Sequence, residues 1–412
     1  MIRPIKIGYR AYQLIMRLGS YFLDFRSPRL LEGPGSLRRL PELIRSMGIR
    51  KVLVVSDKGL VALGLLDDLL RGLSRESVDF VLYDAARANP TIANIEGARQ
   101  FYTAGGCEAI VAVGGGSPLD CAKAAGARIS NPGRSVQQLR GQLKVKRRPP
   151  LLFAVPTTAG TGSEATVAAV VTDPSTHEKY AINDPKLIPA YAVLDPELTV
   201  GLPPHITSTT GMDALTHAVE AYIGRSNTKA TSELSENAVE LIFGNIERAY
   251  RTGKDIEARA NMLLAAHYAG IAFTRAYVGY VHAIAHCVGG LYGVPHGLAN
   301  AVILPYVLEY YGESVAAPLA RLSDRIGFAG SATTRSRKAG MFVDAVKGLN
   351  ARLGIPSSIP EIQEKDIPII VARVLKEANP LYPVPKIMTS RDCEVLVCRL
   401  MIQVPTASVN FP

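Results

Sequence analysis

Short, continuous apolar runs alternate with helical patterns through the first half of the chain. These runs occupy residues 51–57, 80–83, 109–113, 151–155 and 192–194. They are rich in Val, Leu and Ile, and most of their positions are apolar without alternation. Such runs are typical of parallel strands that are covered on both faces. The pattern therefore predicts an α/β region with a mostly parallel sheet.

Beyond residues 201–204 the strand signals end, and the apolar spacing becomes helical over 233–250, 256–273 and 334–353. Pro203 and Pro204 mark the boundary, because proline lacks the N–H donor needed inside a helix or a central strand. We therefore expect three segments: an extension at 1–25, an α/β domain at 26–203 and an all-helical domain at 204–412.

The composition limits the classes of protein to which the chain can belong. With 412 residues, 48% of them hydrophobic and 20% charged, the chain is expected to be globular rather than disordered or fibrous. No apolar run reaches the roughly 18–20 residues that cross a bilayer, and no secretory signal pattern opens the chain. Five cysteines without a CxxC pair argue against a disulfide framework and a thiolate zinc site. A reducing cytoplasm is the expected compartment.

The net charge of +10 lies mostly in two short patches. Residues 1–26 hold five basic side chains against Asp24, and residues 140–148 hold five with no acidic one. No aromatic residues interleave with the second patch, and no nucleic-acid-binding motif accompanies it. We expect a solvated loop there, mildly attractive to anionic ligands, and no nucleic-acid partner.

Residues 1–25 form a basic amphipathic extension. Apolar residues such as Ile7 and Leu14 recur among basic ones at roughly helical spacing. The favoured interpretation is a terminal helix packed on its own protein or on a partner subunit. Two alternatives stay open: a helix lying at a lipid interface, and an organellar presequence, which the low serine content disfavours.

A glycine-rich turn follows the run at 109–113. Gly114, Gly115 and Gly116 let backbone amides approach an anion, Ser117 is expected to be the helix N-cap and Pro118 its first residue. A pyrophosphate would sit on this helix N-terminus. The loop is neither GxGxxG nor a Walker motif, and a simple turn explains it equally well.

A second loop, at 156–164, offers the hydroxyls of Thr157, Thr158, Thr161 and Ser163. Both loops leave the carboxyl ends of predicted strands, where open α/β sheets bind ligands, so together they indicate a nucleotide site. Asp57 ends another strand, where its carboxylate would either bond a ribose hydroxyl, favouring NAD over NADP, or simply cap the next helix.

Five of the seven histidines fall between positions 217 and 296. Asp213 and His217 are four residues apart, as are His282 and His286, so each pair shares a helix face. His296 follows in a turn. One carboxylate and three imidazoles suit a zinc, iron or nickel ion. His267 lacks a partner at helical spacing and is expected in the core or behind the ligands.

From about Phe22 to the C-terminus the sequence resembles the iron-containing (group III) alcohol dehydrogenase family. The matching stretches are residues 31–35, 89–91, 114–123, 156–164, 211–220 and 282–300. The resemblance implies the dehydroquinate synthase-like fold of that family: an α/β dinucleotide-binding domain, here 26–203, and an all-helical metal-binding domain, here 204–412, with the site in the cleft between them. Family members offer no counterpart to the N-terminal extension.

Carried over by position, the resemblance assigns the metal ligands to Asp213, His217, His282 and His296. It places His286 near substrate and nicotinamide, and we suggest that this imidazole relays the alcohol proton to solvent. The implied NAD contacts are Asp57, Asn89, Gly115, Gly116, Ser117, Thr157, Thr158, Thr161, Lys179 and Leu198.

The expected activity is hydride transfer between a primary alcohol, or its aldehyde, and NAD(H). Fe²⁺, or Zn²⁺ in its place, would polarise the alcohol oxygen. The family also implies a homodimer or larger homo-oligomer. The alternatives are a dehydroquinate synthase-like lyase, a glycerol dehydrogenase-type zinc enzyme and a non-catalytic metal- or nucleotide-binding protein. Substrate length and direction of reaction are not marked by any motif.

Overall fold

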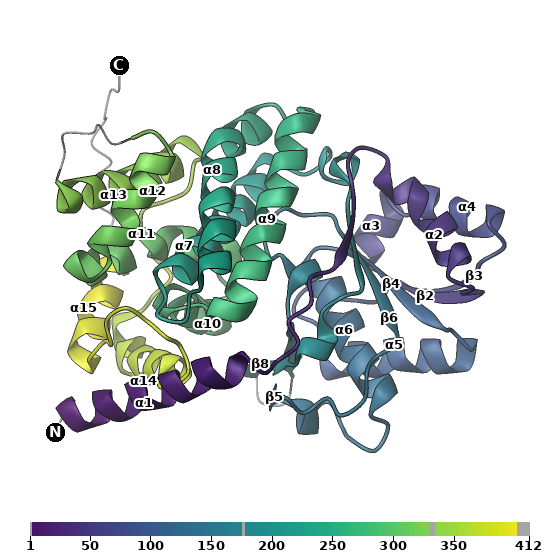
Figure 1. The fold of residues 1–412 in the computed structure, drawn as a ribbon, viewed down its shortest axis with the longest axis horizontal. Coiled ribbons are helices and arrows are strands. Elements are labelled where there is room, and N and C mark those ends of the chain that lie inside the picture. The colour runs from purple at the N-terminus through teal and green to yellow at the C-terminus, as the bar shows by residue number, and fades with distance from the viewer. Residues whose placement is uncertain (1, 175–177, 329–333, 402–412) are drawn as a thin grey trace.

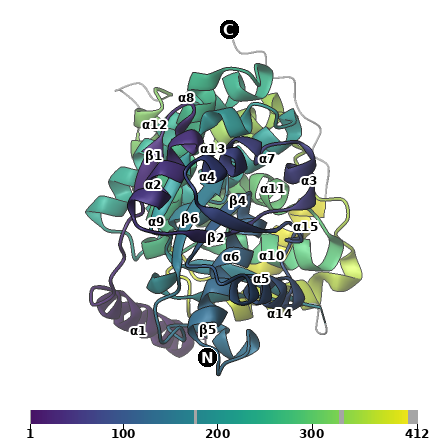
Figure 2. The ribbon, with the colours of Figure 1, turned by 90° about the vertical axis from the view of Figure 1, so that its right-hand side faces the viewer.

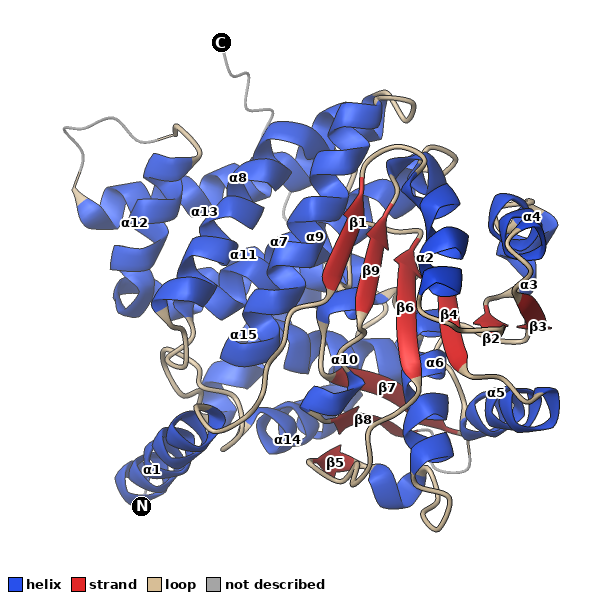
Figure 3. Cartoon of the chain, turned by 45° about the vertical axis from the view of Figure 1, so that its right-hand side comes forward, coloured by secondary structure: helices blue, strands red, loops and turns tan. Residues whose placement is uncertain are grey.

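A six-stranded, fully parallel sheet forms the centre of the first half of the chain, in the computed structural model that describes residues 2–174, 178–328 and 334–401. Its spatial order is β1-β9-β6-β4-β2-β3, as Figure 3 shows. The strands are β1 (Arg29–Glu32), β2 (Lys51–Val55), β3 (Asp79–Tyr83), β4 (Ala109–Gly114), β6 (Leu151–Pro156) and β9 (Tyr191–Leu194).

Helices cover both faces of this sheet. They are α2 (Leu40–Ser46), α3 (Lys58–Ala62), α4 (Asp67–Arg75), α5 (Ile92–Gly105) and α6 (Gly116–Ser130). In β2, Leu53 belongs to the apolar cluster of α5 and α6, whereas its neighbour Val54 belongs to that of α2 and α4. Because successive side chains point to opposite faces, both kinds of position must be apolar. The predicted parallel, two-sided sheet is confirmed.

A small second sheet, in the order β5-β8-β7, was not predicted from the sequence. It comprises β5 (Gly141–Gln142), β7 (Ala168–Asp173) and β8 (Glu178–Asn183), and β7 pairs antiparallel with β8. These strands are short and only partly buried, so their sequences lack the continuous apolar signal of the main sheet. The sheet matters because β8 carries Lys179.

The second half is helical throughout residues 204–328 and 334–401, and it packs beside the sheet domain (Figure 1). Its α-helices are α7 (Pro204–Ile223), α8 (Lys229–Arg251), α9 (Ile256–Ala276), α10 (Tyr280–Tyr292), α11 (His296–Tyr311), α12 (Ala316–Arg325), α13 (Arg335–Arg352), α14 (Ile367–Ala378) and α15 (Ser390–Met401). The helices predicted from periodicity lie on α8, α9 and α13. In α7, every residue from Gly211 to Ile223 is buried, so this helix is the centre of the domain.

The N-terminal extension begins with a regular helix, α1 (Ile2–Ser20). It lies along the lower edge of the helical domain, as Figures 1 and 2 show. Its side chains hydrogen-bond the segment 380–387 of the same chain, so the helix packs on its own protein. Within the described residues, none of the helices is long and apolar enough to cross a membrane.

Candidate metal and nucleotide site

Two buried helices bring the predicted metal ligands together. Asp213 and His217 stand one turn apart on α7, and His282 projects from α10. One ligand atom from each of these three side chains lies within 4.8 Å of the others, and all three side chains are buried. Because of their i, i+4 spacing, Asp213 and His217 lie on the same face of α7, and this face is directed at α10.

The fourth predicted ligand, His296, arrives as the first residue of α11. Its Nε2 atom lies 3.6 Å from Oδ1 of Asp213. The next residue must be glycine, because a Cβ at Gly297 would stand only 2.4 Å from the Thr209 carbonyl oxygen of α7. This close approach of α11 to α7 sets His296 beside the other three.

Asn300, which was missed from the sequence, marks the point where the ligands converge. Its Nδ2 donates to Oδ1 of Asp213 at 2.6 Å and lies 3.2 Å from Nε2 of His282 and 3.1 Å from Nε2 of His296. Ligand atoms from three helices therefore face one small volume. The i, i+4 relation of Asn300 to His296 on α11 was the only signal available in the sequence.

The electrostatics of this cluster suit a cation. Burial lowers the pKa of His217, lowers the pKa of His282 well below its usual value and lowers that of His296 to about 4. The imidazoles are therefore neutral near pH 7, with lone pairs available for binding. In addition, the buried Nδ1 of His217 makes no hydrogen bond of regular geometry among the described residues, although the Gly160 backbone opposes the lowering of the His217 pKa. A carboxylate with three neutral imidazoles fits a divalent iron or zinc ion.

Glu220, one turn after His217 on α7, orients the predicted metal ligand His282. Its Oε2 lies 2.6 Å from Nδ1 of His282, and it also accepts from the backbone N–H groups of Gly279 and Val281. Burial raises the pKa of Glu220 to about 7, although these hydrogen bonds oppose the shift. With Nδ1–H directed at Glu220, Nε2 of His282 is left free to bind metal. No pattern in the sequence indicated this contact between helices.

His286 lies one turn beyond His282, and its ring stacks on His296 with centroids 5.2 Å apart. Its Nδ1 is 2.7 Å from Oε1 of Glu377, which also accepts a 2.9 Å hydrogen bond from the Tyr382 hydroxyl. Burial opposes protonation, but the Glu377 carboxylate outweighs it and raises the pKa of His286. Glu377 and Tyr382 were also missed, because they lie about ninety residues along the chain.

The glycine turn and the hydroxyl loop pack against each other. A Cβ on Gly116 would stand 2.9 Å from the Thr161 side chain, and one on Gly115 would stand 3.4 Å from Thr158. Thr157 is buried behind them, where its N–H bonds the Gly114 carbonyl. The close contact at Gly116 explains the glycine there, whereas the distance at Gly115 is an ordinary van der Waals contact. The packing leaves the N-terminus of α6 beside a row of hydroxyls.

The predicted capping of α6 was wrong in detail. The helix begins at Gly116, and the extended Gly115 is its N-cap, so Ser117 lies within the first turn. Because its Oγ is not needed as a cap, Ser117 instead accepts a 3.2 Å hydrogen bond from the Asn89 N–H. Lys179 then donates to the Asn89 side chain at 2.7 Å. Three of the predicted NAD contacts therefore meet.

Lys179 also connects the two parts of the site. Burial lowers its pKa; its charge opposes the rise in the pKa of His286 and adds to the effect of burial in lowering the pKa of His296. A second link runs through the hydroxyl loop, where a Cβ on Gly160 would stand 2.7 Å from Thr210 of α7, just before Asp213. The nucleotide loops and the metal ligands thus border one another.

The remaining predicted contacts lie farther out on the α/β domain. Asp57 follows β2 and caps α3, since its Oδ1 accepts the Leu60 N–H at 3.0 Å. The capping interpretation is therefore observed, and the second carboxylate oxygen is left for other partners. Leu198 is buried in the apolar cluster on the α2 and α4 side of the sheet.

Glu164 and His267 anchor the hydroxyl loop to the helical domain. Their Oε1 and Nδ1 atoms are 3.2 Å apart, and both side chains are almost fully buried. Next to them, Gly162 and Gly270 touch backbone to backbone. His267 is therefore a buried, paired residue away from the ligand cluster, as expected.

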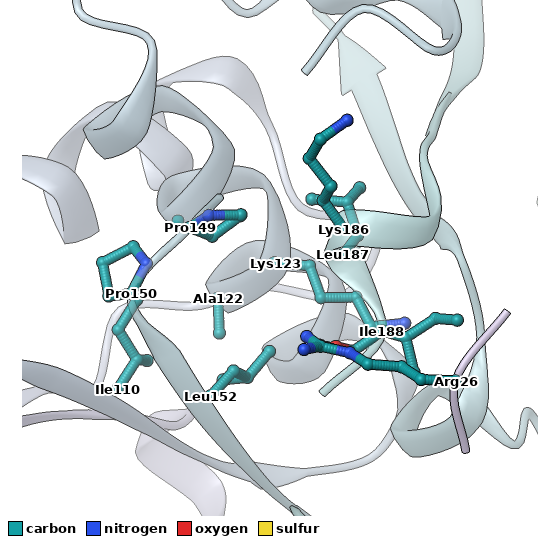
Figure 4. Close-up of a pocket in the computed structure, with 11 residues that line it drawn as sticks. Arg26, Ile110, Ala122, Lys123, Pro149, Pro150, Leu152, Lys186, Leu187 and Ile188 are labelled. Carbon is teal, nitrogen blue, oxygen red and sulfur yellow. Dashed lines mark hydrogen bonds between the residues drawn. The ribbon is translucent and has the colours of Figure 1, made fainter. Parts of the chain in front are cut away.

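A separate cavity, of about 10 Å³, lies where Lys123 and Pro149 approach Arg26 (Figure 4). That volume holds roughly one water molecule. Neither the histidine cluster nor the glycine turn lines it, so it is not the site described above.

Comparisons with known proteins agree with this geometry. The family "Iron-containing alcohol dehydrogenase" matches residues 27–196, and "Fe-containing alcohol dehydrogenase family, C-terminal" matches residues 207–400. Alcohol dehydrogenase 4 of Schizosaccharomyces pombe is 37% identical over 359 residues, covering 86% of this chain and 84% of the relative. The 1,3-propanediol dehydrogenase of Citrobacter freundii is 36% identical over 351 residues, covering 84% and 90%.

Among solved structures, a 1,3-propanediol oxidoreductase superposes with a TM-score of 0.88 at 33% identity, covering 92% of this chain and all of the other. These matches, together with the ligand cluster and the nucleotide loops, favour neither a lyase nor a non-catalytic binding protein. The chain belongs to the iron-containing alcohol dehydrogenase family and is a metal-dependent oxidoreductase that uses NAD and an alcohol or its aldehyde.

Proposed function

We propose that this enzyme interconverts a small primary alcohol and its aldehyde at the cluster formed by Asp213, His217, His282 and His296. The observation that carries the proposal is the convergence of three buried ligand atoms within 4.8 Å, with His296 3.6 Å from Asp213. A divalent cation bound by these residues would supply Lewis-acid polarisation of the substrate oxygen, and bound NAD would supply the hydride acceptor or donor. The names of relatives that act on 1,3-propanediol or lactaldehyde support small alcohols and diols as the substrate class.

The chain's own contribution is positioning and proton handling. Glu220 fixes the orientation of His282, and Asn300 holds the ligand atoms of Asp213, His282 and His296 toward one point. In this proposal His286 receives the alcohol proton and shares it with Glu377, and the 2.7 Å distance between the Glu377 oxygen and the imidazole supports this path. Glu377 is about one third exposed, so a proton transferred to it is close to solvent.

The nucleotide would lie across the two packed loops. In this proposal the pyrophosphate meets the N-terminus of α6 at Gly115, Gly116 and Ser117, and the hydroxyls of Thr157, Thr158 and Thr161 line its path. Asn89, Lys179 and Leu198 complete the contacts. Asp57 accepts from the adenine ribose with the oxygen that does not cap α3, which disfavours a 2′-phosphate.

The same proposal covers the domain division and the assembly. Residues 26–203 bind the nucleotide, and 204–412 supply the metal ligands. A homodimer or larger assembly is supported by β1, an edge strand whose Leu30 is exposed. A cytoplasmic location is supported by five cysteines that are all free.

The test is metal analysis of protein purified without oxygen, followed by an NADH-coupled assay over alcohols, diols and aldehydes of graded length. We expect stoichiometric iron or zinc, and NADH formation with at least one small primary alcohol. Protein that binds metal and NADH but turns over none of these substrates would contradict the proposal. Consumption of a phosphorylated polyol without net NADH would instead indicate the lyase alternative.

A further inference from the structure

Helix α1 turns its polar side toward the protein. Four long polar side chains in the described part of the helix donate to backbone carbonyl groups of the helical domain, at distances of 2.7–3.2 Å. The pairs are Lys6 with Ile387, Arg10 with Val384 and Pro385, Gln13 with Pro380 and Tyr382, and Arg17 with Arg225. Lys6, Arg10 and Arg17 are therefore directed at the helical domain and are partly buried against it.

The opposite side of α1 and the residues just after it form an apolar strip. Ile7, Ile15 and Phe22 are 68%, 68% and 90% exposed. The other exposed members are Ile5, Tyr12, Leu14, Leu18 and Tyr21. This is the reverse of the usual surface helix, which buries its apolar face against its own core. Because its own domain leaves so large a strip uncovered, some other apolar medium is needed to cover it.

A strongly basic loop lies at the same end of the molecule. Lys144, Lys146, Arg147 and Arg148 are exposed, and the stretch 137–150 contains no acidic residue. Arg148 reaches Asp24, just after α1, with a 3.7 Å nitrogen–oxygen distance. Figures 1, 2 and 3 each show α1 and β5, the short strand just before the basic loop, toward the lower end of the molecule. The helix that carries the apolar strip and the basic loop therefore lie at the same end of the protein.

We propose that this end of the protein docks on an anionic lipid surface, with the apolar strip of α1 buried among the headgroups and the loop 140–148 on the lipid phosphates and carboxylates. An interfacial helix with a neighbouring polybasic patch supplies the two signals that stable but reversible membrane attachment requires. Exposed Tyr12, Tyr21 and Phe22 suit the headgroup level, where aromatic rings collect. The rigid bonding of α1 to the segment 380–387 would hold the whole enzyme at the surface.

The charge of the basic loop favours an anionic lipid surface over a second copy of the chain as the partner of the apolar strip. If two copies met through α1, the strip would be covered, but the basic loop would gain no opposite charge, and in a parallel pairing the two loops would repel each other. An anionic bilayer complements both features at once. The proposal does not depend on the substrate or on the proton path.

The experiment is co-sedimentation of the full-length enzyme with vesicles of phosphatidylcholine alone or of phosphatidylcholine with phosphatidylserine. We expect binding to the anionic vesicles, weakening as salt is raised. The variant Ile7→Asp/Ile15→Asp should lower the partition coefficient by about tenfold or more. Lys146→Glu/Arg147→Glu should have a comparable effect. NADH formation in solution should be unchanged in both, because these residues lie outside the site.

Two control variants carry the same types of substitution at other exposed positions, and so test whether the location of the changed residues matters. Met47→Asp/Val395→Asp changes two exposed apolar residues elsewhere, and Lys254→Glu/Lys365→Glu changes two exposed cations elsewhere; both should bind vesicles like the unmodified protein. Absence of binding, equal binding to neutral vesicles, or unchanged binding by either test variant would overturn the proposal. Self-association that Ile7→Asp/Ile15→Asp abolishes, without vesicle binding, would assign the strip to a second copy instead.

Discussion

Nδ1 of His282 lies 2.6 Å from Oε2 of Glu220, and both side chains are almost completely buried. The contact joins α10 to α7 and fixes which nitrogen of the imidazole faces the other ligands. Glu220→Gln keeps the shape but removes the charge that supports the ligand, so we expect about 10- to 100-fold weaker metal binding. Competition with a chelator, followed by metal analysis, measures it. Glu233→Gln on the exposed side of α8 is the control, and equal losses in both variants would contradict the role of Glu220.

His286 and Glu377 form the proposed proton path. His286→Ala should lower kcat by about 100-fold or more, because acid–base groups commonly contribute at least that much. Glu377→Gln should lower kcat less, since the imidazole remains in place. Metal content and NADH binding should stay normal in both variants, which steady-state kinetics and metal analysis together would check. Unchanged kcat in His286→Ala would remove this residue from the mechanism, and Glu364→Gln serves as the surface control.

Asp57 has two separable roles, as a helix cap and as the proposed ribose partner. Asp57→Asn retains a capping side chain but removes the charge, whereas Asp57→Ala removes both. We expect both variants to raise kcat/KM for NADP relative to NAD. Only Asp57→Ala should lose stability, by about 1 kcal/mol, because a cap is lost. Coenzyme kinetics and denaturant unfolding measure the two effects, and an unchanged coenzyme preference would leave Asp57 as a cap alone.

The cysteines should differ in reactivity, because alkylation requires the thiolate. Burial raises the pKa of Cys287 to about 11 and those of Cys121 and Cys393 to about 12. At pH 8 these thiols are protonated in the folded protein, and their labelling should speed up only as the pH approaches those values or the chain unfolds. Cys398 is the least buried and should react first with iodoacetamide. Peptide mass spectrometry resolves the sites, and early modification of Cys121 would contradict this order.

The main fold could be predicted from the sequence wherever the residue pattern within a single strand or helix was enough to identify that element. Continuous apolar runs identified β2, β4 and β6, and helical spacing identified the faces that carry Asp213 with His217 and His282 with His286. It did not reveal β7 and β8, whose half-exposed residues carry no strong period. It also missed Glu220, Asn300, Glu377 and Tyr382, because their roles arise from contacts between helices. The polarity of α1 is a similar case, since periodicity shows two faces but not which one meets the protein.

A single catalytic metal ion, held by Asp213, His217, His282 and His296 beside the nucleotide loops, is the feature on which the proposed function depends. Its most direct test is elemental analysis of anaerobically purified protein and of the four single alanine variants, with NADH binding measured by fluorescence on the same samples. We predict one iron or zinc ion per chain in the unmodified enzyme and a large loss in every variant, with NADH still bound. Full metal content in any of the four variants, together with normal turnover, would contradict the account.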